Sequence, residues 1–159
     1  MVILKKQTFG SVATVLAFVL ALAGLITYHV NVGGAGYFQG AAVHQANTLM
    51  ILSMVALLAV VVLAQLELGK VADKVLDIVS GLLRIAAPAG LAAAAMQLIS
   101  GRAQGIAFIY FSNEEVLAEV QTAANLSSAS CAITNVVLLA LAAVVGVVAA
   151  FFTLKKKNA

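Results

Sequence analysis

Charge is scarce in this sequence. Of its 159 residues, 9% are charged and 64% are hydrophobic. Soluble domains carry roughly 25% charged residues, so this chain has too few to cover a surface that faces water. The composition therefore predicts a polytopic membrane protein with a single domain. The basic residues lie at the ends of apolar runs and form no basic face, which argues against nucleic-acid binding despite a net charge of +3.

Cysteine is nearly absent, since Cys131 stands alone. A single cysteine excludes an intramolecular disulfide framework, a multi-cysteine zinc site and the CxxC pair of four-helix thiol oxidoreductases. Acidic residues are missing from the apolar runs, whereas proton-coupled carriers and small multidrug exporters need an acid within the membrane. The charged signature of glutathione-transferring membrane enzymes is also missing. We therefore expect a protein that is not an enzyme and that binds no cofactor.

Four apolar runs have about the length needed to cross a bilayer, which is ~20 residues. The first run also fits a signal peptide, with Ala21-Leu22-Ala23 as a cleavage pattern, but its length favours an uncleaved span. The connection that follows is rich in glycine, which predicts a flexible turn. We predict an all-α four-helix membrane bundle with spans at about residues 9–30, 46–66, 82–100 and 131–154.

Two connections carry patterns of their own. Residues 67–81 repeat apolar side chains from Leu68 to Val79 at helical spacing, with charges on the other side. This pattern predicts an amphipathic helix that lies on the membrane surface, extends the third span or docks a partner. Within residues 101–130, the aromatic run Ile106–Phe111 predicts a segment that lies in the membrane interface or packs on the outer mouth of the bundle. Ser112 is the predicted N-cap of a short helix that follows this run.

Basic residues predict the orientation, because cytoplasmic loops carry an excess of Lys and Arg. With a cytoplasmic N-terminus, Arg102 is the one basic residue on the outer side. The inner side then holds Lys5, Lys6, Lys70, Lys74, Arg84, Lys155, Lys156 and Lys157. We therefore predict that both termini are cytoplasmic, that the membrane is the plasma membrane, and that residues 101–130 form an outer cap.

Most polar residues of the spans lie near their predicted outer ends. Polar groups in hydrocarbon tend to face the protein interior, so these residues predict a polar cluster or vestibule. Alternatively, each one caps a span or bonds a neighbouring helix. The spacing of the histidines and glutamates matches no known metal motif, so we expect no metal and no haem. The candidate cluster comprises His29, His44, Asn47, Gln97, Arg102, Glu114, Glu115, Glu119 and Asn135.

Small residues fill much of the third and fourth spans. They let helix backbones approach closely, which is how membrane helices associate. We therefore expect the chain to lie in a lipid bilayer as a homo-oligomer or as a subunit of a larger membrane complex. The outer cap would be its recognition surface. The alternative is an oligomeric cation-preferring channel whose vestibule carries Glu114, Glu115 and Glu119. The candidate helix-packing face comprises Ala89, Gly90, Ala93, Ala94 and Gly146.

Overall fold

A computed structural model describes residues 8–65 and 70–154 of the chain, with the side chains of 70–73 excepted. Within this part, four helices are long and apolar enough to cross a membrane, as the composition predicts. A fifth, shorter helix lies between the last two of them. The helices are α1 (Phe9–Gly33), α2 (His44–Leu63), α3 (Lys70–Phe111), α4 (Glu114–Val120) and α5 (Ala123–Ala150).

Some residues on which the predicted topology depends lie outside the part of the chain that the structure describes, or have side chains outside it. This holds for Leu68 and for most of the basic residues counted toward the orientation, namely Lys5, Lys6, Lys70, Lys155, Lys156 and Lys157.

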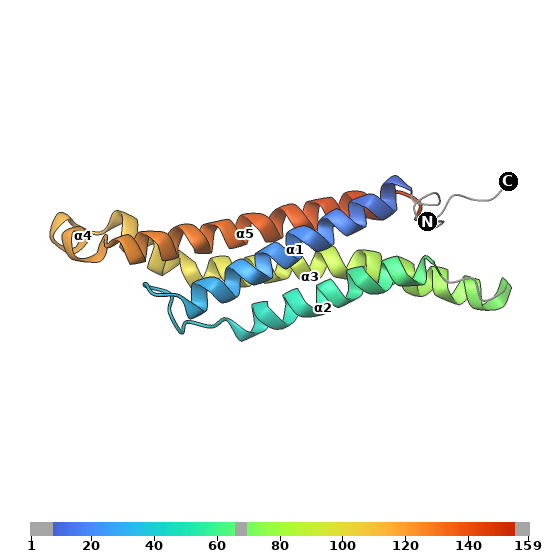
Figure 1. The fold of residues 1–159 in the computed structure, drawn as a ribbon, viewed down its shortest axis with the longest axis horizontal. Helices are drawn as coiled ribbons and strands as arrows, with labels where there is room; N and C mark the ends of the chain where they lie inside the picture. Colours follow the sequence, from blue (N-terminus) through green and yellow to red (C-terminus); the bar gives the residue numbers. More distant parts are fainter. Residues whose placement is uncertain (1–7, 66–69, 155–159) are drawn as a thin grey trace.

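The four long helices run side by side (Figure 1). α1 packs against α5 and α2, and α3 packs against α2 and α5 on the other side of the bundle. α1 begins and α5 ends at the same end of the bundle, which we call the terminal end. The opposite end carries the α1–α2 connection and, beyond it, α4 (Figure 1). We call it the loop end.

The core of the bundle is built largely from alanine, with a few larger side chains between the helices. Ala17, Ala21 and Ala94 are fully buried, and so are Met50 and Leu139. Because lipid is as apolar as these side chains, burying them in the bundle gives little hydrophobic gain. Close packing and dispersion contacts between the helices therefore hold the bundle together.

α3 is much longer than the predicted third span. Its 42 residues extend about 63 Å at ~1.5 Å per residue, twice the ~30 Å of a hydrocarbon core. Residues 74–81 extend the span, which was one of the options for the predicted amphipathic connection. Ile106–Phe111 forms the last turns of the same helix, and it packs on the bundle through the fully buried Ile109.

The short helix expected after the aromatic run is present as α4. Asn113 is its N-cap, and the Asn113 side chain accepts a 3.0 Å hydrogen bond from the N–H of Val116. The prediction of Ser112 as N-cap is therefore wrong. The Ser112 hydroxyl donates instead to the carbonyl of Phe108, 2.7 Å away, because Ser112 directly follows the last turn of α3.

Arg84 joins α3 to the end of α5 at the terminal end. Its Nη2 donates to the carbonyls of Ala149 at 2.7 Å and Ala150 at 2.8 Å, and also to the carbonyl of Phe152. The last carbonyls of a helix lack partners within that helix, so the guanidinium acts as a C-terminal cap. The sequence predicted only that this side chain could reach the lipid headgroups.

Candidate functional site

Arg102 lies inside the loop end of the bundle. Its side chain is 2% exposed, and its Nη2 donates to the carbonyl of Ala41 over 2.7 Å. The guanidinium also lies over the ring of Phe38, 4.4 Å from the centroid. Among the described residues no carboxylate forms an ion pair with it. A backbone carbonyl and an aromatic face thus replace water around this cation.

The α1–α2 connection is fastened to the helices around it. The N–H of Phe38 donates to Ser128 Oγ on α5 at 3.2 Å, and that hydroxyl donates to Asn31 Oδ1 on α1 at 2.8 Å. The hydroxyl of Tyr28 accepts from the N–H of Val43 at 2.7 Å. Together with Arg102, these bonds connect the loop to α1, α3 and α5. The prediction of a flexible turn is therefore corrected to an ordered closure of the loop end.

Two glycines make this close fit possible. Gly36 has φ 126°, in the left-handed region that favours glycine, and a Cβ there would collide with the Ala124 carbonyl. On α3, a Cβ at Gly105 would lie 2.7 Å from Cε1 of Phe38. The aromatic side chains of the loop therefore rest directly on the α3 backbone.

Other members of the predicted polar cluster have different surroundings. Asn135 is buried on α5 and its Nδ2 donates to the carbonyl of Gly24 on α1. The buried Oδ1 of Asn47 has no hydrogen-bond partner among the described residues. His29 and His44 are exposed, as is Gln97. In the described part of the chain, no hydrogen bond joins two members of the cluster.

The three glutamates lie on α4, which has no buried residue. α4 packs mainly on the end of α3 and lies beyond the loop-end termini of α1 and α2 (Figure 1). Glu114 and Glu115 occupy its first turn, where the helix dipole favours negative charge. Within the described residues, no three His, Cys, Asp or Glu side chains could hold a metal ion.

The predicted helix-packing face divides into an inward and an outward part. Ala94 and Gly146 are buried, and a Cβ at Gly90 would collide with Ser53 Oγ of α2. Ala89 and Ala93 are exposed. They belong to a line of exposed small and polar residues at spacings of three and four, which places them on one face of α3. We call this line the outward stripe: Ala86, Ala89, Ala93, Gln97, Ser100 and Gln104.

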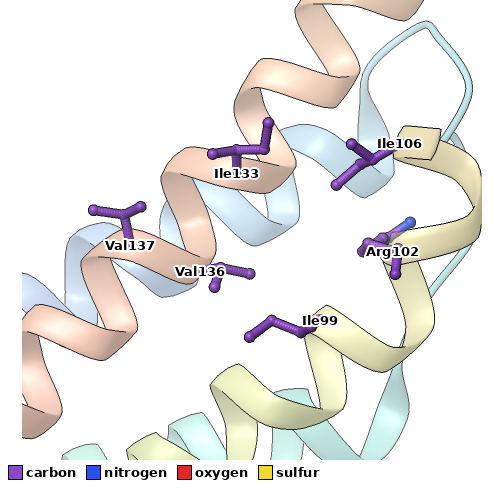
Figure 2. A pocket seen from close by; sticks show the side chains of 7 residues that line it. Ile99, Arg102, Ile106, Ile133, Val136 and Val137 are labelled. Atoms are coloured by element: carbon purple, nitrogen blue, oxygen red, sulfur yellow. The ribbon is translucent and has the colours of Figure 1, made fainter. Parts of the chain in front are cut away.

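A groove of about 160 Å³ lies between α3 and α5 in the loop half of the bundle. Its walls are aliphatic except for Arg102, whose nitrogen is directed away from the other lining side chains (Figure 2). The groove residues are Ile99, Arg102, Ala103, Ile106, Ile133, Val136 and Val137.

The residues that close the loop end could not be selected from the sequence. Asn31 and Ser128 are 97 residues apart, and each looks like an ordinary polar residue near the end of an apolar run. Two residues of the closure did stand out in the sequence. Tyr28 is an aromatic residue at a span boundary, and Gly36 belongs to a glycine-rich turn. The chain matches no known protein-family model, no curated protein and no solved structure.

Proposed function

We propose that this chain is a non-enzymatic membrane subunit that assembles with copies of itself through the outward stripe of α3. The supporting observation is that Ala89, Ala93 and Gln97 are exposed in the middle of an apolar helix. Lipid tails offer no hydrogen-bond partner to an amide, so polar residues of spans normally face protein. Small residues allow a second helix to approach, and amides then bond across the contact.

The two arginines of α3 support a position of the stripe within the bilayer. Arg84 and Arg102 are separated by five turns of helix, or about 27 Å at ~1.5 Å per residue. That separation is close to the ~30 Å thickness of a hydrocarbon core. We infer that the arginines lie near the two boundaries, so that Ala89, Ala93 and Gln97 lie between them.

We further propose that the termini are cytoplasmic and that the loop end faces outward, on the basis of the positive-inside count. α4 and the end of α3 would then form the recognition surface of the subunit in a larger complex. The exposure of this region supports the assignment: Phe111 is 83% exposed, and all three glutamates of α4 are exposed.

A cation-preferring pore is the second candidate. The inside of one copy is filled by fully buried side chains such as Leu91, Leu98 and Leu139, so a pore would have to run between copies. Gln97, Ser100 and Gln104 are the exposed polar residues of the stripe that could line it. The glutamates of α4 would then attract cations at its mouth.

The mass of the purified protein in several mild detergents tests both candidates. We expect one species whose protein mass is a multiple of 16.2 kDa. A monomer in every detergent would contradict assembly and pore alike. If an oligomer forms, current measurements in planar bilayers separate the two candidates. A cation-selective current that falls in Glu115→Gln and Glu119→Gln identifies a pore, whereas an oligomer without conductance is an assembly subunit.

A further inference from the structure

The groove between α3 and α5 exists because these helices are held close at one level and stand apart at another. In the terminal half, a Cβ at Gly146 would lie 3.1 Å from Cβ of Pro88, so the two backbones are in near contact. In the loop half, the facing residues include Ile133 and Val136, whose β-branched side chains have little rotamer freedom. They leave a space of about 160 Å³ open between the helices.

We propose that this groove is a binding site for the acyl chain of a membrane lipid. The lining matches such a ligand, because aliphatic side chains from both helices form it and the Arg102 nitrogen is directed elsewhere (Figure 2). An unfilled space would leave its lining atoms without dispersion partners on one side. A flexible chain of methylene groups can fill such a space without a hydrogen bond.

The size of the groove is suited to part of one chain. An apolar protein cavity of about 150 Å³ holds a benzene molecule, which has six carbons. A space of about 160 Å³ therefore accommodates a short segment of an acyl chain, and the rest of the lipid remains in the bilayer.

The surface around the groove favours lipid over a second protein copy. Besides Ala103, the exposed residues of the groove are large and aliphatic: Ile99 is 48% exposed, Ile133 43% and Val137 49%. The outward stripe, by contrast, is small and polar. Ala103, which lines the groove, and Gln97, which belongs to the stripe, are separated by about 120° around the α3 axis at ~100° per residue. The acyl site is therefore distinct from the proposed assembly face and does not rest on it.

Photolabelling tests the site directly. The full chain is reconstituted into phosphatidylcholine vesicles that contain a small fraction of phosphatidylcholine with a diazirine on one acyl chain, at a lipid excess that keeps copies apart. After illumination, labelled residues are identified by mass spectrometry. We expect labelling of groove residues to exceed that of Leu22 and Ile26, exposed α1 residues at about the same level of the bundle, by about fivefold.

Two variants in which an alanine of α3 is replaced by phenylalanine provide the decisive comparison. Ala103→Phe places a ring in the groove and should reduce labelling of Ile133 and Val137 to the α1 level. Ala92→Phe adds the same ring to an exposed α3 position about three turns away from Ala103 and outside the groove lining, and it should leave their labelling unchanged. Circular dichroism of each variant verifies the helix content.

Three outcomes would overturn the site. Labelling that is equal on the groove and on α1 would show that the groove retains no lipid. Enriched labelling that persists in Ala103→Phe would locate the lipid elsewhere. Groove labelling that is lost when copies associate, in the absence of any variant, would identify a protein segment as the occupant. The first two outcomes do not depend on whether the outward stripe mediates assembly.

Discussion

α1 exposes large aliphatic side chains, whereas α3 exposes a line of small and polar residues beside its own large apolar ones. The exposed side chains of α1 include Val12, Leu16, Val19, Leu22 and Ile26, which are large and aliphatic. Over a similar length, the outward stripe of α3 exposes alanine, glutamine and serine. Both helices are apolar enough to cross a membrane. The mean hydropathy of α3 is nevertheless the lower of the two, in keeping with the small and polar residues of its stripe.

The difference follows from how helices associate in lipid. Large aliphatic side chains pack against acyl chains about as well as against protein. Exchanging lipid contacts for protein contacts at such side chains therefore gains little free energy. Alanine and glycine allow backbones to approach, and an amide in hydrocarbon gains from a protein partner. The proposed assembly through the outward stripe therefore predicts that α1 faces lipid and that α3 carries the association face. The predictions below test that division, from the largest expected effect to the smallest.

Gly90→Leu should have the largest effect. Gly90 faces Ser53 of α2, and a side chain there would overpack the contact between the two helices. We expect the free energy of unfolding to fall by about 3 kcal/mol. Unfolding in a denaturing detergent, followed by circular dichroism, measures the change. A variant as stable as the original would contradict the assignment of Gly90 to the inward face of α3.

Ala89→Leu combined with Ala93→Leu should leave the fold intact and weaken association. Both alanines are exposed, so the added side chains meet lipid in a single copy and collide only with a second copy. We expect association to weaken by about 2 kcal/mol, or roughly thirtyfold. Energy transfer between labelled copies in detergent measures this. Unchanged association would show that copies meet through another surface.

Gln97→Leu should weaken association by about 1 kcal/mol, the order found for hydrogen bonds between membrane helices. The same energy-transfer assay measures it. Gln45→Leu is a control, because Gln45 is an exposed glutamine on α2 and does not belong to the stripe. Tighter association of Gln97→Leu would mean that the amide makes no bond across the contact.

Leu16→Ala and Val19→Ala on α1 should have the smallest effect. Both side chains are about half exposed, at 49% and 53%, and in the bilayer they meet acyl chains. We expect stability and association to change by less than about 0.5 kcal/mol each. A loss of association in either variant would break the comparison, because α1 would then also be an interface.

Local patterns predicted much of the fold. The existence of four spans followed from long apolar runs, and the short helix α4 followed from a capping residue ahead of helical spacing. The N-cap itself was misplaced by one residue. Ser112 and Asn113 are both good caps, and the sequence does not show that Ser112 is already engaged by the last turn of α3.

The partners of individual polar residues were beyond prediction. Arg84 reaches carbonyls at the end of α5, and Arg102 reaches the loop between α1 and α2. Each partner is more than 60 residues away along the chain. From the sequence, both arginines could only be assigned to the ends of a span. The small residues of α3 were likewise predicted as one packing face, although Gly90 faces α2 and Ala89 is exposed.

The sequence by itself determined that this chain is helical, that it has four segments able to cross a membrane, and where its charges lie. These properties depend on composition and on spacing within single segments, which act before any two helices meet. The tertiary structure decided which residues of each helix face inward, how Arg102 and Phe38 close the loop end, and where α3 and α5 stand apart. Those features depend on contacts between distant segments, and their geometry arises only when the helices pack.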